Sequence, residues 1–160
     1  MWLFRQHHEH FARVRNILIA ATGIALTLYV LFPVAPPRLA GLGFADTVSS
    51  SAEVNLSSRF LSGLYNPVAA VPSLHFGYAL LVGFTLALLA RRRWVRALGG
   101  LYPAVMLLVI VATGNHFFFD AAAGTLAIGI GLLTATWISS SREWRRQTFP
   151  EPIRGVPDAT

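Results

Sequence analysis

The sequence contains no cysteine and no lysine, and it has few charges of either sign. Without cysteine the chain can form neither disulfides nor thiolate metal sites, and it has no cysteine nucleophile. Without lysine, Schiff-base chemistry and the lysine of a phosphate-binding P-loop are excluded as well. Only 12% of the residues are charged, against a usual share of about 25%. The five histidines are the side chains left that titrate near physiological pH, and all 13 basic residues are arginine.

Apolar residues are abundant instead, at 54% of the 160 positions, and they gather in four long runs. A transmembrane helix needs about 20 mostly apolar residues, so we expect spans at residues 14–32, 76–90, 97–113 and 117–138. Glycines and a proline interrupt the third run, which membrane helices tolerate. The sequence therefore predicts an all-α, polytopic membrane helix bundle with about four transmembrane helices.

The segments between the runs complete the expected organisation. Residues 1–13 form a polar lead-in, and residues 40–70 form a loop with a short interfacial helix at 57–65. We expect one membrane-embedded domain at residues 1–146 and a disordered tail at 147–160, because the tail is polar and contains prolines. The histidines of the lead-in lack a second cluster of ligands, so they receive no site role.

The arginines are distributed unevenly between the two ends of the spans. Basic residues are enriched in cytoplasmic loops, so the arginine-rich side is expected to be cytoplasmic. That side holds Arg5, Arg13, Arg15, Arg91, Arg92, Arg93, Arg96, Arg142, Arg145, Arg146 and Arg154. The opposite side holds Arg38 and Arg59, together with His75, His116 and Asp120. We predict a multi-pass plasma-membrane protein with cytoplasmic termini and an extracytoplasmic site, and we read the net charge of +6 as topology rather than nucleic-acid binding.

His116 and Asp120 stand at the start of the fourth apolar run. Placing an unpaired ionisable group in or beside a span costs about 3 kcal/mol or more, and such groups commonly mark functional sites. On a helix their i, i+4 spacing would put both side chains on one face. The carboxylate would then hold one imidazole nitrogen as N–H and leave the other free. The alternative is a purely structural pair, a helix-capping histidine bonded to a buried aspartate.

Two histidines, an aspartate and arginines suit phosphoryl transfer through a histidine. One imidazole, oriented by Asp120, would attack phosphorus, and a second would protonate the leaving oxygen. Arginine and the free N–H groups of a helix start would neutralise the phosphoryl oxygens. A site at the membrane surface admits a lipid headgroup, so lipid phosphates or polyprenyl phosphates are the expected substrates. Water or an alcohol would be the acceptor, and no cofactor is expected.

Two stretches also resemble a known family. AAVPSLHFGYAL (69–80) resembles the second motif of the type 2 phosphatidic acid phosphatase superfamily, usually Pro-Ser-Gly-His. GNHFFFDAAAG (114–124) resembles the end of its third motif, His-x-x-x-Asp. The resemblance covers about residues 29–131 and is closest to the branch that includes inositol phosphorylceramide synthases and many actinobacterial membrane proteins. In that branch a proline-rich motif follows the preceding span, as Pro36, Pro37 and Arg38 do here.

The resemblance implies roles for individual residues. His116 would be the nucleophile that forms a phosphohistidine, Asp120 its orienting carboxylate, and His75 the acid that protonates the leaving group. Arg38 would take the place of the phosphate-binding arginine of the first motif. The family's usual lysine and the Ser-Arg pair before His116 are missing, and Leu74 stands where glycine is common. The phosphate cradle must therefore be built differently, and we predict that it uses Arg38, Ser73, Arg59 and Asn115.

Other interpretations stay open at this point. The family usually has about six core helices, and the four here match the last four. We therefore expect either that two N-terminal helices are missing or that another chain, such as a second copy, supplies the absent wall. A rival enzyme class is a metal-dependent hydrolase with the metal held by His75, His116 and Asp120. A rival outside catalysis is a lipid-binding or transporter subunit. An alcohol acceptor would make the protein a lipid headgroup transferase.

Overall fold

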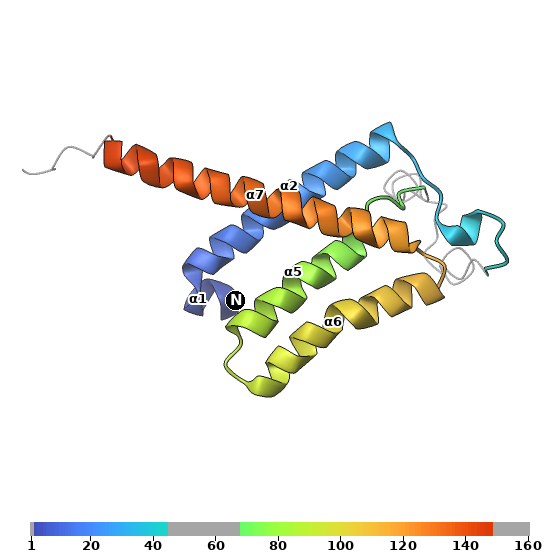
Figure 1. The fold of residues 1–160 in the computed structure, drawn as a ribbon, viewed down its shortest axis with the longest axis horizontal. Coiled ribbons are helices and arrows are strands. Elements are labelled where there is room, and N and C mark those ends of the chain that lie inside the picture. Colours follow the sequence, from blue (N-terminus) through green and yellow to red (C-terminus); the bar gives the residue numbers. More distant parts are fainter. Residues whose placement is uncertain (1, 45–67, 149–160) are drawn as a thin grey trace, which may run out of the picture.

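The computed structural model describes residues 2–44 and 68–148, with side chains as far as residue 141. Within these ranges the chain is almost entirely helical (Figure 1). The helices are α1 (Trp2–Gln6), α2 (His8–Leu31), the short 3-10 helix η1 (Pro37–Leu39), α5 (Leu74–Leu89), α6 (Arg93–Ala112) and α7 (Phe118–Thr148). The helix expected at residues 57–65 lies outside the described residues.

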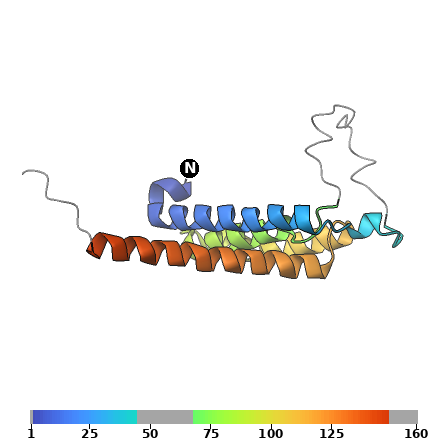
Figure 2. The ribbon, with the colours of Figure 1, turned by 90° about the horizontal axis from the view of Figure 1, so that it is seen from above.

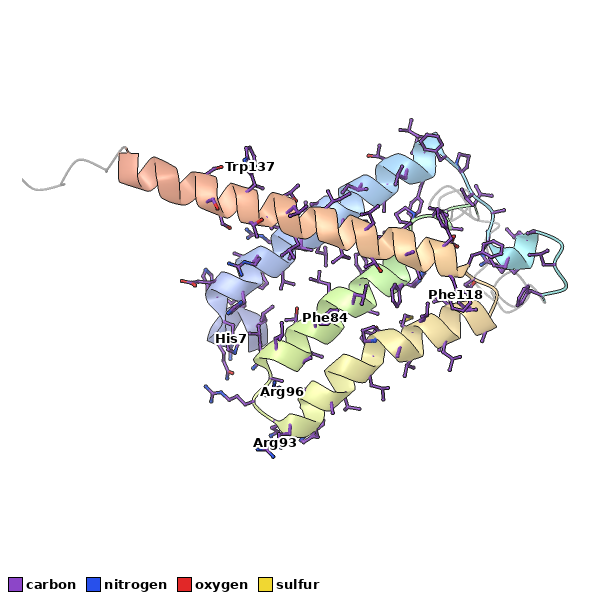
Figure 3. The ribbon with its side chains drawn as sticks, in the orientation of Figure 1. His7, Phe84, Arg93, Arg96, Phe118 and Trp137 are labelled. Atoms are coloured by element: carbon purple, nitrogen blue, oxygen red, sulfur yellow. The ribbon has the colours of Figure 1, made fainter. Side chains whose placement is uncertain are left out.

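Among the described residues, three helices are long and apolar enough to cross a membrane: α2, α6 and the part of α7 at Phe118–Ser141. α5 is apolar too but has only 16 residues, and at 1.5 Å per residue it is about 24 Å long. Large apolar side chains such as Phe84 and Trp137 are exposed, as lipid-facing residues are, and Trp137 points away from the bundle (Figure 3). The prediction of an all-α membrane helix bundle is confirmed, and the second expected span corresponds to α5, which is shorter than α2, α6 and α7.

The helix boundaries differ from the expected ones at several points. The polar lead-in is helical, forming α1 and the start of α2. α5 begins at Leu74, two residues before the expected start at 76, with Ser73 as its N-cap and Pro72 just before the helix. α7 continues past residue 138 to Thr148, and within it Ser139, Ser140 and Ser141 donate their hydroxyls to carbonyls four residues earlier. The predicted tail begins inside α7, and from residue 149 it lies outside the described residues.

Small residues allow the helices to pack closely. α5 packs mainly against α6, and α2 mainly against α7, while α5 also contacts α7. A Cβ on Gly83 would lie 2.6 Å from the carbonyl oxygen of Gly99, so the α5 and α6 backbones approach as only glycine allows. Ala21 and Ala25 of α2 are fully buried in the same way. Such close backbone contact is the usual basis of helix association in lipid.

The bundle has two chemically different ends. The end of α2, the start of α5, the end of α6 and the start of α7 meet at one end (Figure 1), and the bundle is flat and elongated when it is seen from above (Figure 2). The turn between α5 and α6 and the start of α6, with Arg93 and Arg96, lie at the other end, far from Phe118 (Figure 3). Because successive long helices run in alternating directions, the segments that carry His75, His116 and Arg38 lie at one end.

Candidate active site

A tight turn between α6 and α7 fixes the position of His116. Gly114 has a φ of 65°, in the left-handed region that glycine adopts easily, and it ends α6 by bonding back to Val111. The backbone N–H groups of Asn115 and His116 then both donate to the carbonyl of Ile110, at 3.0 Å each. His116 therefore lies just before α7 and is 6% exposed.

Asp120 contacts both the His116 ring and the start of α7. Its Oδ2 lies 3.3 Å from His116 Nδ1 and accepts the backbone N–H of Phe117 at 2.8 Å. The carbonyl oxygen of Ala70 lies 3.0 Å from the same Nδ1. Because both neighbours of Nδ1 are acceptors, Nδ1 carries the hydrogen and Nε2 keeps its lone pair. Asp120, 1% exposed, thus caps the helix and orients the histidine at once.

His75 lies on the other edge of the His116 ring. It occupies the first turn of α5, and its Nδ1 is 3.3 Å from His116 Nε2. Since His116 Nε2 is an acceptor, His75 Nδ1 is the donor in this contact. The side chain of His75 is exposed, whereas that of His116 is buried.

Ser73 joins the His75 segment to the start of α7 through its backbone. Its N–H donates to the carbonyl of Asp120 at 2.9 Å. Its own carbonyl oxygen is so close to α7 that a Cβ added to Gly124 would lie 2.3 Å from it. The Ser73 hydroxyl accepts the N–H of Phe76 and so caps α5. Ser73 is fully buried. Its predicted part in phosphate binding stays a prediction, while its part in the fold is to dock α5 on α7.

Arg38 is held beside His116 at two points. Its backbone N–H donates to the carbonyl of Gly114 at 3.0 Å, and its Nη1 donates to Oδ1 of Asn115. The segment before it is tied to the His75 segment, because Val34 and Ala69 form an isolated parallel bridge. The proline-rich stretch therefore places a half-buried guanidinium next to the His116 turn.

Burial has a larger effect on the pKa of His116 than the neighbouring charged and polar groups have. Desolvation lowers the pKa of His116 below its usual value, since the protonated ring loses water. The carboxylate of Asp120 acts in the opposite direction and offsets part of this effect, while His75 lowers the pKa further. The balance favours a neutral His116 with a free lone pair on Nε2.

The predicted site residues that the structure describes gather at one end of the bundle. Arg59, the remaining one, lies outside the described residues. His75, His116, Asp120, Ser73, Arg38 and Asn115 are linked by the hydrogen bonds given above. Sequence reasoning missed Tyr29, whose hydroxyl donates to the carbonyl of Pro72 at 2.7 Å and ties α2 to the same cluster. A tyrosine near the end of an apolar run was the available signal.

The donor geometry does not suit the rival metal site. Asp120 faces Nδ1 of His116 and His75 faces Nε2, so the three side chains lie on opposite edges of one ring and do not converge. In the described part of the chain, no group of three or more His, Asp or Glu side chains is arranged to hold a metal ion. The arrangement instead offers a nucleophilic nitrogen, its orienting carboxylate, a neighbouring proton donor and a cation.

Comparison with known families decides where this arrangement belongs. A family model described as the PAP2 superfamily matches residues 1–134. The chain belongs to the PAP2 superfamily. The match includes every predicted site residue and all described helices as far as the middle of α7. Membership in the PAP2 superfamily supports a phosphatase or phosphotransferase type of activity on lipid phosphates. Comparison with curated proteins and with solved structures returned no significant match.

Proposed function

We propose that the protein is a lipid-phosphate phosphatase or phosphotransferase that works through a phosphohistidine and needs no metal ion. The observation that carries this proposal is the His116 ring, whose Nδ1 is held by Asp120 and Ala70 while Nε2 faces His75. A histidine fixed in this tautomer is a ready nucleophile. The chain's membership in the PAP2 superfamily supports phosphorus as the atom that His116 attacks.

The proposed reaction has two balanced steps. Nε2 of His116 attacks phosphorus, the bond from phosphorus to the lipid oxygen breaks, and His75 gives its proton to the leaving oxygen. Water then attacks the phosphohistidine, His75 takes the proton of that water, and phosphate leaves as the bond to Nε2 breaks. Arg38 and the first-turn N–H groups of α5 would neutralise the phosphoryl oxygens. With a phosphodiester donor, the phosphorus on Nε2 would still carry the headgroup after the lipid oxygen leaves, and an alcohol that attacks in place of water would receive phosphate and headgroup together.

The contact between the two histidines implies a movement before the reaction. At 3.3 Å the nitrogens leave no space for a phosphoryl group, which needs about 3–3.5 Å on the side of the nucleophile alone. His116 is buried, whereas His75 is exposed. We therefore infer that His75 swings outward when substrate enters, and that the resting contact keeps His116 in its reactive tautomer.

The location and the substrate class complete the proposal. The excess of arginine at the end opposite His116 supports a multi-pass plasma-membrane protein with an extracytoplasmic site. Exposed Phe117, Phe118 and Phe119 beside His116 would contact the lipid tail while the headgroup is bound. The proline-rich segment before Arg38 supports the inositol phosphorylceramide synthase-like branch, so transfer to an alcohol acceptor is the second candidate.

The test is a screen of the purified protein against a panel of lipid and polyprenyl phosphates, with and without alcohol acceptors. We expect release of phosphate or headgroup transfer in the presence of a chelator, and inhibition by orthovanadate. His116→Ala should abolish the activity, whereas His8→Ala, a change of an exposed histidine at the other end, should not. Activity that survives in His116→Ala would refute the nucleophile. Loss of activity in chelator would support the metal-dependent rival, and no activity on any lipid phosphate would support a non-catalytic role.

A further inference from the structure

Asn115 uses both ends of its side-chain amide in contacts with the protein. Oδ1 accepts a hydrogen bond from Arg38 Nη1, and Nδ2 donates to Thr113 Oγ1 at 2.8 Å. Thr113 Oγ1 in turn donates to the carbonyl of Val109 at 2.7 Å. The result is a continuous chain of hydrogen bonds from the last turn of α6 to the guanidinium of Arg38.

The chemistry of the partners fixes the orientation of this amide. A guanidinium can only donate, so the atom of Asn115 that faces it must be the oxygen. The hydroxyl hydrogen of Thr113 is given to Val109, so Thr113 offers a lone pair, and the atom that faces it must be the nitrogen. The reverse orientation would place two donors face to face at Arg38. The side chain therefore has one orientation that satisfies both neighbours.

From this geometry we propose that Asn115 is a positioning residue that sets the guanidinium of Arg38 for the phosphoryl group, and not a phosphate ligand of its own. This inference rests on the function proposed above. Asn115 directly precedes His116 in the chain, and Arg38 is also bonded through its backbone to Gly114. The distance from the cation to the nucleophile is thereby set by two hydrogen bonds to the same turn. These two hydrogen bonds would hold the guanidinium of Arg38 in place although the family's usual basic residues before His116 are missing.

The test is a double-mutant cycle in the full chain, with orthovanadate as the probe. The variants are Asn115→Ala, Arg38→Ala and the two combined, and the readouts are vanadate affinity in detergent and KM for a lipid phosphate. Loss of a hydrogen bond to a charged group typically weakens binding about tenfold to a hundredfold, so we expect Asn115→Ala to weaken vanadate binding and raise KM by that factor. In the Arg38→Ala background the same change should have no further effect, because its target is gone.

A second variant tests the same chain of bonds with less disturbance to the turn. Thr113→Val removes the acceptor for Asn115 Nδ2 but keeps the shape of the side chain, so we expect a smaller loss in the same direction that also vanishes without Arg38. Thr136→Val is the matched control, because Thr136 is an exposed helical threonine whose hydroxyl bonds to its own helix. It should leave vanadate affinity and KM unchanged.

The outcomes separate this inference from the proposed function. If the losses from Asn115→Ala and Arg38→Ala add, or if Thr113→Val behaves as Thr136→Val does, Asn115 acts independently of Arg38 and the inference is wrong while the function stands. If the wild-type protein neither binds vanadate nor acts on any lipid phosphate, the proposed function fails and the inference fails with it. Parallel losses that disappear in the Arg38→Ala background establish the positioning role.

Discussion

Both nitrogens of the His116 ring have defined neighbours, and they differ in kind. Nδ1 faces two acceptors, a carboxylate and a carbonyl, whereas Nε2 faces the exposed His75. The same carboxylate of Asp120 also caps α7 through Phe117. The structural interpretation of the pair, as a helix cap, and the catalytic one are therefore compatible, because one oxygen serves both. The catalytic interpretation makes one further prediction, that the titration of His116 appears in the pH profile of the activity.

The first prediction concerns that titration. Because burial lowers the pKa of His116, the acid limb of the pH profile of kcat/KM should lie below the usual histidine value of about 6.5. Asp120 raises this pKa, so Asp120→Asn should move the acid limb to still lower pH. The same variant should lower kcat by about 10²–10⁴-fold, because the orienting acceptor is lost. A limb that stays in place or moves to higher pH in Asp120→Asn would contradict the assignment of His116 as the titrating nucleophile.

At the scale of the helices, the site depends on how closely α5 approaches α7. The contact lies at Gly124, where any Cβ would meet the carbonyl oxygen of Ser73, and at the bond from Ser73 N–H to the carbonyl of Asp120. Two residues further along α5 is His75. The position of the proposed acid relative to the nucleophile is thus set by backbone contacts between two helices rather than by the histidines themselves.

The second prediction follows from this contact. In Gly124→Ala the new Cβ would lie 2.3 Å from a backbone oxygen, and a backbone cannot rotate away as a side chain can. We expect a loss of stability of about 1–3 kcal/mol, together with loss of activity as α5 moves away from α7. Gly129→Ala is the matched control in the same helix, since nothing lies within 4 Å of its Cβ position. Thermal unfolding in detergent and the phosphate-release assay would decide, and equal behaviour of the two variants would show that the close approach is not required.

The same contacts explain which parts of the site could be predicted from the sequence. The pairing of His116 with Asp120 is local, so their spacing was sufficient to suggest it. Arg38 and Asn115 are 77 positions apart, and the docking of His75 on His116 depends on Gly124, so no local pattern reveals either contact. The family motifs brought these residues into one prediction, but not the hydrogen bonds between them. The span expected at residues 117–138 ends where the hydropathy falls, whereas α7 continues as a helix to Thr148, because a drop in hydropathy marks the end of a span and not the end of a helix.

For the whole molecule, the alternation of helix directions determines which groups share an end. The chain passes the length of the bundle four times in α2, α5, α6 and α7 (Figure 1). α5 is short, but it pairs along its length with α6, which is long enough to span, and so both ends of α5 lie near the ends of α6. The arginine-rich turn and the His116 turn are therefore at opposite ends, and only their assignment to the two sides of the membrane is left to the arginine bias.

The third prediction tests that assignment, and the absence of cysteine from the sequence makes the test clean. Single cysteines would be introduced at two exposed positions, Leu42→Cys at the His116 end and Gln6→Cys in α1 at the other. Because arginine-rich ends stay in the cytoplasm, we expect an impermeant thiol reagent to label the Leu42→Cys variant in intact cells and the Gln6→Cys variant only after permeabilisation. Each variant should retain phosphate release, which shows that the labelled protein is folded.

The opposite labelling pattern would put His116 on the cytoplasmic side, where the substrate would have to come from the inner leaflet. Labelling of both variants in intact cells would mean that α1 and the His116 end do not lie on opposite sides, and the four-pass arrangement would then be wrong.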